Sequence, residues 1–107
     1  MTAPDPACGA GTPSTDFARA VASVLASLND GDVVTYGEVA REAGFPRRAR
    51  AVGMLLARDG HRYPWWRVVT AAGRLVPGNE VEHARRLRAE GVALVDGRVP
   101  MGRRARR

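Results

Sequence analysis

The sequence predicts one mainly helical α+β domain, with a winged helix-turn-helix-like order of elements and a small β-hairpin. Its 107 residues suit a single domain. Two short helical segments are separated only by the tight turn "AGF", which is the pattern of a helix-turn-helix. After them come a glycine turn between apolar runs and one further helical segment. We expect the folded part to cover residues 15–99.

The two ends of the chain are predicted to lie outside this domain. Residues 1–14 are rich in Pro, Gly, Ala, Ser and Thr, a composition that predicts a disordered N-terminal tail. The run "GRRARR" predicts a basic C-terminal tail over residues 100–107, because like-charge runs are usually solvated.

Apolar residues at helical spacing predict the first helix, in "STDFARAVASVLASLNDGD". Thr15 or Asp16 is placed to cap its N-terminus, and "NDGD" is placed to end it. The apolar positions are Phe17, Val21, Val24, Leu25 and Leu28.

Capping signals predict the second and third helices. Thr35, followed three residues later by Glu38, forms a capping box for a helix over about residues 36–43, and Gly44 ends that helix. Pro46 stands at a predicted first helical position and opens the third helix, "PRRARAVGMLLARDG".

The C-terminal third is predicted to contain two hairpins and one helix. "RVVTAAGRLV" indicates two short strands around residues 72–73, and "VALVDGRV" indicates a last hairpin around residues 96–97. Between them, Asn79 and Glu82 predict a cap and capping box for a fourth helix, which Gly91 closes.

The charge balance points to an anionic partner. The chain has a net charge of +6, and all 17 basic residues are arginine. A GC-rich genome explains the choice of arginine over lysine but not the excess of cations over acids. A basic domain attracts nucleic acid or an anionic membrane surface. No strongly apolar amphipathic helix accompanies the charge, so nucleic acid is favoured.

Several classes of protein are excluded by composition. Cys8 is the only cysteine, so an internal disulfide and a cysteine-based zinc cluster are ruled out. No apolar run approaches the roughly 20 residues that span a bilayer. The N-terminus lacks the basic and apolar regions of a signal peptide. We therefore expect a cytoplasmic, monomeric protein with no cofactor, metal or membrane partner.

The third helix is the candidate reading head. At 100° per residue, one face carries cations and small residues, and Ala49, Val52 and Leu56 lie on the opposite, apolar face. The cations would be attracted to phosphates in any sequence context, although a merely solvated arginine face would look the same. The candidate DNA-binding residues are Tyr36, Arg47, Arg48, Arg50, Ala51, Met54 and Arg58.

Two motifs resemble a known family. "VVTYGEVAREAGFPRRARAVG", followed by "PWWRVV", is similar to the DNA-binding domain of O6-alkylguanine-DNA alkyltransferases. Those proteins have a Tyr-Gly pair opening the helix-turn-helix, Arg-Ala-Val-Gly on the recognition helix, and a Pro-Cys-His-Arg-Val active-site motif. The resemblance extends from about Phe17 to Val95.

The active-site motif departs from the enzymes at two positions. Trp65 stands where they have the acceptor cysteine, and Trp66 stands where they have the histidine that activates it. Covalent transfer needs a positioned nucleophile and a base, and indole supplies neither. Cys8, in the predicted tail, has no reason for the lowered pKa of a reactive thiol. The chain most resembles the alkyltransferase-like proteins, which have tryptophan in the cysteine position.

That resemblance implies a non-enzymatic sensor of DNA damage. Alkyltransferase-like proteins bind O6-alkylguanine in duplex DNA through the minor groove, flip the base, and pass the lesion to nucleotide excision repair proteins. A generic helix-turn-helix would instead enter the major groove. The stretch "VPGNEVE" lacks the Tyr-Ser pair of the loop that closes over the base in the enzymes, so the resemblance leaves open how the pocket closes.

The resemblance also implies roles for two residues at the duplex. Arg50 matches the arginine finger that fills the gap left by a flipped nucleotide, where a planar cation can stack and hydrogen-bond. Its alternative role is a phosphate contact. Tyr36 matches the tyrosine that crowds the phosphate of the target nucleotide, and its alternative is a half-buried aromatic at a helix start.

Around the lesion pocket we expect Tyr36, Trp65 and Arg67. Trp65 would pack an indole face against the modified base, whereas Trp66 is expected in the core because consecutive extended residues point to opposite sides. Arg67 would brace the motif by bonding neighbouring carbonyls, with DNA contact as the alternative. His61 and His83 are expected on the solvated surface.

Two other functions remain open at this point. A winged-helix transcription regulator, or a general DNA-binding protein, would read or bind DNA without regard to damage. An enzyme that has moved its nucleophile elsewhere would still transfer the alkyl group.

Overall fold

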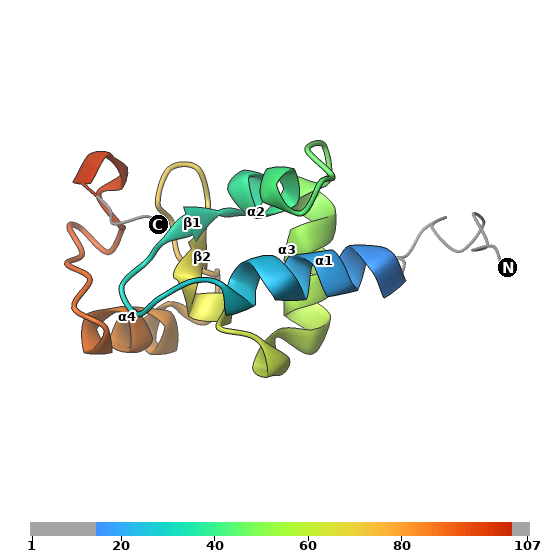
Figure 1. Ribbon diagram of the computed structural model, residues 1–107. Helices are drawn as coiled ribbons and strands as arrows, with labels where there is room; N and C mark the ends of the chain where they lie inside the picture. Colours follow the sequence, from blue (N-terminus) through green and yellow to red (C-terminus); the bar gives the residue numbers. More distant parts are fainter. Residues whose placement is uncertain (1–14, 104–107) are drawn as a thin grey trace, which may run out of the picture.

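Four α-helices and one two-stranded parallel sheet form the computed structural model over residues 15–103, the part of the chain that it describes (Figure 1). The side chains of residues 15, 61 and 103 are not described. The predicted tail over residues 1–14, and residues 104–107 of the predicted basic tail, lie outside the described residues. The elements are α1 (Thr15–Ala26), β1 (Val34–Thr35), α2 (Tyr36–Glu42), α3 (Ala49–Asp59), η2 (Gly60–Arg62), η3 (Trp65–Arg67), β2 (Val68–Val69), α4 (Glu80–Ala89) and η4 (Met101–Arg103), where η marks a 3-10 helix.

The capping signals of α2 are confirmed. The Thr35 side chain accepts from the Glu38 backbone N–H at 3.0 Å, and the Glu38 side chain accepts from the Thr35 N–H at 2.9 Å. At the other end, Gly44 has a φ of +93°, and the N–H of Phe45 donates to Ala40 O at 2.8 Å. These bonds form a Schellman motif, which ends the helix where the sequence predicted.

The third helix begins later than predicted. It starts at Ala49, because Pro46 takes the second position of a turn that the Arg48 N–H closes on Phe45 O at 2.9 Å. The fixed φ of proline suits this turn position as well as the first turn of a helix. The buried face of α3 contains Val52, Leu55 and Leu56, so Leu55 belongs to the core in addition to the predicted stripe.

The predicted hairpin around residues 72–73 is wrong. Strand β2 pairs in parallel with β1, with Val68 opposite Val34 and Val69 opposite Thr35. The chain then turns at Gly73, whose carbonyl accepts from the Val99 N–H at 2.9 Å. A Cβ on Gly73 would lie 2.2 Å from Val99 O, and its φ is +81°. The turn is therefore docked onto the C-terminal segment and is not followed by an antiparallel strand.

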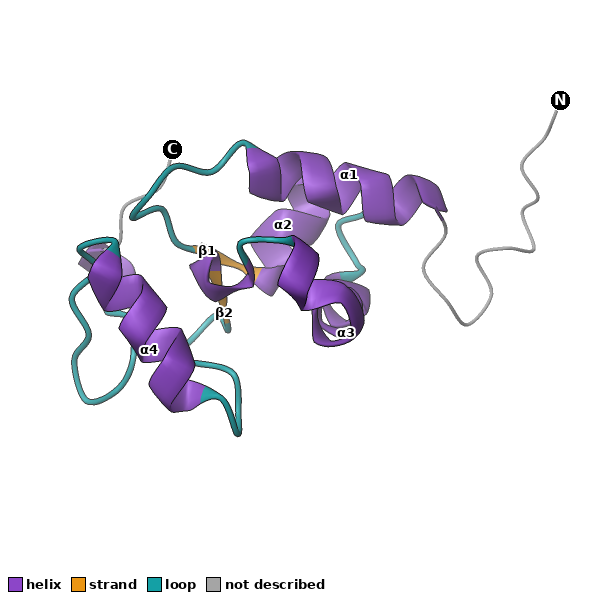
Figure 2. Cartoon of the chain, turned by 90° about the horizontal axis from the view of Figure 1, so that it is seen from below, coloured by secondary structure: helices purple, strands orange, loops and turns teal. Residues whose placement is uncertain are grey.

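The sheet separates two hydrophobic clusters. Val34 and Val68 pack into a cluster with α1, α2 and α3, whereas Val33 and Val69 pack into a second cluster with residues of α4 and the C-terminal segment. Neighbouring residues of an extended segment point to opposite faces. Val33, just before β1, and Val34 therefore supply one valine to each side, as Val68 and Val69 of β2 do. Figures 1 and 2 both show α4 on one side of β1 and β2, with α1, α2 and α3 on the other.

The predicted capping box of α4 is wrong, but its C-terminal stop is confirmed. Asn79 makes no side-chain capping bond, and the Glu82 carboxylate bonds to arginines of its own helix. Gly91 has a φ of +88°, and the Val92 N–H donates to Leu87 O at 3.0 Å, a second Schellman closure.

The last predicted hairpin is present as a single antiparallel bridge between Val95 and Arg98. Asp96 and Gly97 both have positive φ, 53° and 75°, as a tight hairpin turn requires. The mainly helical α+β fold is thus confirmed. Within residues 15–103, no helix has the length and apolar character needed to cross a membrane.

Candidate nucleic-acid interface

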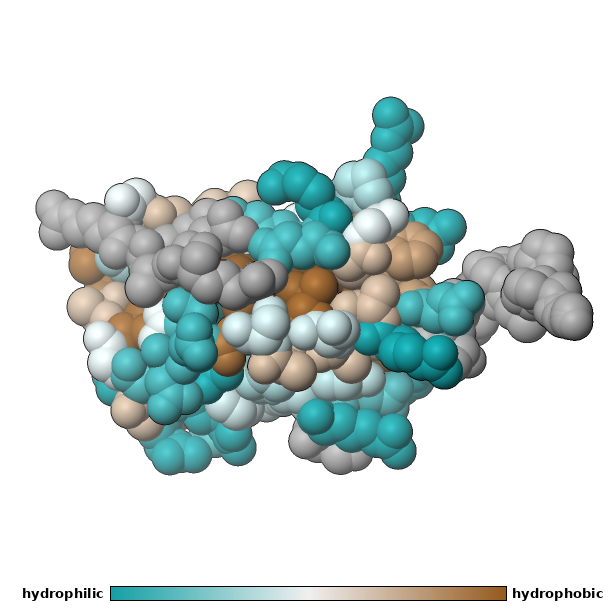
Figure 3. Space-filling view, in the orientation of Figure 1, coloured by the Kyte–Doolittle hydropathy of each residue, from teal (hydrophilic) through white to brown (hydrophobic). Residues whose placement is uncertain are grey.

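The start of α3 and the turn before it form an exposed basic surface. Arg47, Arg48 and Arg50 are exposed, and within residues 15–103 no ion pair engages them. Met54 is 54% exposed, an uncommon exposure for a large apolar side chain. Figure 3 shows hydrophilic side chains projecting from the molecule, with hydrophobic surface between them, on the face seen in Figure 1. The predicted DNA-binding face is therefore accessible to a large anionic partner.

A cavity of about 490 Å³ lies beside this helix. That volume is in the range that holds small organic ligands, roughly 300–1,000 Å³. Its walls come from α2, α3, the η2–η3 region and the segment before α4, so it is built where several elements meet. The lining residues are Tyr36, Gly53, Leu56, Ala57, Arg58, Gly60, Trp65, Val76 and Asn79.

Two predicted residues, Tyr36 and Trp65, meet at this cavity. A Cβ on Gly53 would lie 3.8 Å from Cε1 of Tyr36, and a Cβ on Gly60 would lie 3.7 Å from Cβ of Trp65. The small residues of the α3–η2 region thus let both aromatic side chains lie against the helix. Burial raises the pKa of the Tyr36 phenol above its ordinary value, which keeps the hydroxyl protonated as a donor.

Arg67 lies away from the cavity, so its predicted place in the pocket is corrected. Its side chain is 11% exposed, and its guanidinium donates to both oxygens of Glu90, to Asp30 at 2.6 Å and to Leu28 O at 3.1 Å. It braces the motif by donating to a backbone carbonyl, as predicted. That carbonyl, of Leu28, and the carboxylates of Asp30 and Glu90 belong to other parts of the fold. The bond to Glu90 raises the pKa of Arg67 above its ordinary value.

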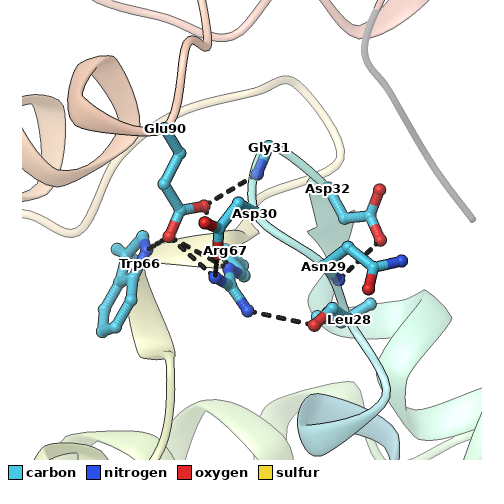
Figure 4. A network of polar contacts seen from close by, with 8 residues as sticks. All are labelled: Leu28, Asn29, Asp30, Gly31, Asp32, Trp66, Arg67 and Glu90. Carbon is cyan, nitrogen blue, oxygen red and sulfur yellow. Dashed lines mark hydrogen bonds and ion pairs between the residues drawn. The ribbon is translucent and has the colours of Figure 1, made fainter.

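Glu90 is the centre of this polar network (Figure 4). Besides Arg67, its carboxylate accepts from the Trp66 indole N–H at 2.7 Å and from the Gly31 backbone N–H at 2.9 Å. Burial acts to raise the pKa of Glu90, but the bonds from Arg67, Gly31 and Trp66 outweigh it and hold that pKa below 4.5. One charged side chain thus joins α4, η3 and the loop that leads to β1.

His83 is fully buried, contrary to the prediction of a solvated surface residue. Its Nδ1 accepts from the Val76 N–H at 3.1 Å, and its Nε2 lies 2.8 Å from Trp66 O. An acceptor at Nδ1 places the proton on Nε2, so the imidazole is neutral. Burial lowers the pKa of His83 below 6.5, against the opposing effect of the Trp66 carbonyl.

The two tryptophans point into different surroundings. Trp65 packs against the first cluster and Trp66 against the second. Both are only partly buried, so the core prediction for Trp66 holds only in part, because its ring packs on the edge of the core. The rings meet edge to face, with centroids 6.2 Å apart. They occupy the 3-10 helix η3 and not an extended segment, and successive residues of such a helix are turned by about 120°.

Arg86 covers the outer side of the tryptophan pair. Its guanidinium carbon lies 4.8 Å from the Trp66 centroid and 5.8 Å from the Trp65 centroid, distances that allow cation–π attraction. Glu82 accepts from Arg85 and Arg86, which lowers the pKa of Glu82 to about 2.

Sequence reasoning missed His83, Arg86 and Glu90. A signal was present for two of them, because Leu87 marks the apolar stripe of α4, and positions four before and three after it share that stripe on a helix. His83 and Glu90 occupy those positions. Among the described residues, no group of three or more histidine, cysteine or acidic side chains could hold a metal ion.

The fold and this site define a class of protein: a winged helix-turn-helix-like domain in which α3 and the turn before it carry exposed arginines beside a ligand-sized cavity. Residues 16–92 match the family described as 6-O-methylguanine DNA methyltransferase, DNA binding domain, and the chain belongs to that family. The resemblance identified from its motifs is therefore confirmed.

Relatives with characterised names show how the chain compares within the family. It is 42% identical over 80 residues to the DNA base-flipping protein of Escherichia coli, covering 71% of this chain and 62% of that protein. The chain thus spans less than two thirds of that relative. It is 33% identical over 86 residues to Alkyltransferase-like protein 1 of Schizosaccharomyces pombe, covering 74% of this chain and 79% of that protein.

A solved structure of the same fold contains DNA. The crystal structure of S. pombe Atl1 in complex with damaged DNA containing O6-carboxymethylguanine superimposes with a TM-score of 0.68 at 31% identity. The match covers 75% of this chain and 80% of that chain.

Proposed function

We propose that this protein is a non-enzymatic sensor of alkylation damage, which binds O6-alkylguanine in duplex DNA and holds the flipped base in the cavity beside α3. The observation that carries the proposal is the place of Trp65. It lines a cavity of base-holding size in a family whose enzymes resemble this chain but have a cysteine at that position. An indole wall can stack on a base but cannot accept an alkyl group.

The exposed surface of α3 and its preceding turn is the proposed contact with the duplex. Arg47 and Arg48 neutralise phosphates, which is the sequence-independent part of the affinity. Arg50 enters the stack and fills the gap that the flipped nucleotide leaves, and Ala51 and Met54 lie against the groove. Docking is through the minor groove, as in the proteins that this chain resembles.

Tyr36 and Arg58 both line the cavity, and we propose that the flipped nucleotide enters beside them. Tyr36 presents a protonated hydroxyl beside the phosphate of the target nucleotide, and Arg58, with a side chain 58% exposed, presents a cation to the backbone. Trp65 forms the wall against the modified base. After binding, we propose that the complex is passed to nucleotide excision repair proteins, since the protein does not remove the alkyl group.

The relatives support this proposal. The E. coli relative is named a DNA base-flipping protein, and the S. pombe relative was solved with DNA that contains an O6-alkylated guanine. The shared family and fold bring base flipping and the binding of alkylated DNA to this chain as a proposal.

The test compares two duplexes that differ at one position, guanine against O6-methylguanine. We expect the alkylated duplex to bind about 10-fold more tightly or better, a difference of about 1.4 kcal/mol. Intact mass after incubation should show unmodified protein. Equal affinity for both duplexes would contradict the proposal and, if affinity varied with sequence, would favour a transcription regulator. A gain of one methyl group in mass would show a relocated nucleophile.

A further inference from the structure

The imidazole of His83 joins the two walls of the cavity. One nitrogen accepts from the N–H of Val76, which lines the cavity. The other donates to the carbonyl of Trp66, whose neighbour Trp65 also lines the cavity. Because His83 is fully buried, both bonds are shielded from water. One ring therefore fixes how far apart η3 and the segment before α4 lie.

The same ring supports Trp65 from behind. The centroids of His83 and Trp65 are 5.0 Å apart, with their planes at 63°. Among the described residues, no hydrogen bond is formed by the Trp65 indole N–H, so packing sets the angle of the indole. Two polar side chains lie against the Trp65 ring. One is His83, and the other is Arg86, whose guanidinium carbon is 5.8 Å from the ring centroid.

We propose that His83 is a positioning residue for the cavity, and that discrimination between alkylated and normal guanine requires its neutral form. This inference rests on the function proposed above. Neutral His83 holds the Val76 segment and Trp65 at the separation that accepts a flat modified base. Protonated His83 releases the segment and opens the cavity.

Protonation has this effect because of what faces each nitrogen. A proton on Nδ1 would point at the Val76 N–H, so that two donors would face each other and the bond would be lost. A buried unsatisfied donor is costly, and a buried charge more so. The segment over residues 76–79 carries no charged side chain.

The carboxylates near His83 are engaged by other groups, and the Glu80 carboxylate accepts from the Gly78 N–H. Arg86 adds a like charge, with its guanidinium over the Trp65 and Trp66 rings. On α4, the Glu82 carboxylate bonds to Arg85 and Arg86. The Glu90 carboxylate is occupied by Arg67 of η3, together with Trp66 and Gly31. Protonation is therefore resisted in the closed form, and burial lowers the pKa of His83.

The experiment measures lesion preference, the ratio of Kd for the normal duplex to Kd for the O6-methylguanine duplex, as a function of pH. For the wild-type protein we expect this ratio to stay high near neutral pH and to fall about 10-fold in acid, below the pH at which an exposed histidine titrates, because burial lowers the pKa of His83. His83→Gln keeps an amide N–H for Trp66 O but has no titrating group, so its ratio should not change with pH. His61→Gln, which removes the only other histidine, should keep the wild-type profile.

Each outcome decides a different point. A wild-type ratio near one at about pH 8 would overturn the proposed function and this inference with it. A clear preference that is constant with pH, or one that falls equally in His83→Gln, would overturn only the role of His83. If His83→Gln does not fold, His61→Gln still decides, because its single imidazole NMR signal belongs to His83. A signal that does not titrate over the pH range in which the ratio falls would overturn the role of His83.

Discussion

The indole Nε1 of Trp66 donates a 2.7 Å hydrogen bond to Oε2 of Glu90, a residue 24 positions later in the chain. In the enzymes that the chain resembles, the position of Trp66 holds a histidine of the proton relay. Here the indole N–H can only donate, so the contact cannot move a proton from a nucleophile. The bond holds η3 against the C-terminal end of α4.

Removing this donor should weaken the fold. For Trp66→Phe we expect a loss of about 1–3 kcal/mol in the free energy of unfolding, because the charged carboxylate of Glu90 loses one of its hydrogen-bond donors. Urea denaturation measures the loss. Trp65→Phe is the matched control, since it removes the same bulk without removing a described hydrogen bond. Equal losses in the two variants would show that the bond to Glu90 contributes nothing beyond packing.

Acid should weaken the fold through the same carboxylate. The pKa of Glu90 lies below its ordinary 4.5 in the folded protein, so its stabilising effect is present above pH 4.5 and is lost as the pH falls below that value. We expect Glu90→Gln to be less stable than the wild type at neutral pH and to lose less stability as the pH is lowered into the acid range. Thermal unfolding as a function of pH measures both differences. Glu82→Gln is the comparison, because Glu82 is half-buried outside this network and its pKa of about 2 affects the same acid range. A Glu90→Gln decline as steep as that of wild type would contradict this account.

Arg50 and Arg47 should respond differently to truncation. An intercalated Arg50 offsets part of the cost of unstacking, a few kcal/mol, only when a base has left the helix. We therefore expect Arg50→Ala to reduce the preference for alkylated over normal duplex by about 10-fold. Arg47→Ala should weaken both duplexes by similar factors, as loss of a phosphate contact does.

A fluorescent base provides an independent measure of the same step. A 2-aminopurine beside the lesion should brighten when its neighbour leaves the stack, and Arg50→Ala should reduce that change. Arg50→Lys should recover only part of it, because an ammonium cannot stack as a guanidinium does. If Arg50→Ala weakened both duplexes alike and left the fluorescence change intact, Arg50 would be a phosphate contact.

Restoring the acceptor alone should not restore repair. In Trp65→Cys, the thiol would lie beside Trp66, which offers no base to activate it. We expect intact mass spectrometry to show no rapid methylation of this variant by O6-methylguanine duplex. The double variant Trp65→Cys, Trp66→His places an imidazole where Glu90 accepts the Trp66 bond, and it should be methylated faster than the single variant. Rapid methylation of the single variant would show that no relay is needed.

Local signals in the sequence predicted the helices well. The box of Thr35 and Glu38 and the closure at Gly44 involve bonds between residues at most five apart, so the sequence contains all their partners. Pro46 misled the boundary of α3, because its fixed φ fits both a helix start and a turn.

Long-range contacts were not predictable in this way. The partner of Val68 is Val34, whereas the glycine turn after residue 69 indicated a local hairpin. His83 was expected on the surface as an isolated histidine, yet Val76 and Trp66 satisfy both of its nitrogens. Such burial depends on partners that only the folded chain brings together.

The alternation of valines along β1 and β2 has a consequence for how the domain tolerates mutation. Val34 and Val68 belong to the side that carries the basic helix, and Val33 and Val69 belong to the side that carries α4 and Trp66. Changes in separate clusters share few partners, and effects of such changes are nearly additive. Most of the cavity is lined from the side that carries the basic helix. Changes in the second cluster reach the cavity through His83 and the Val76 segment, so a lineage can adjust the support of the cavity while it keeps the helix that holds the DNA.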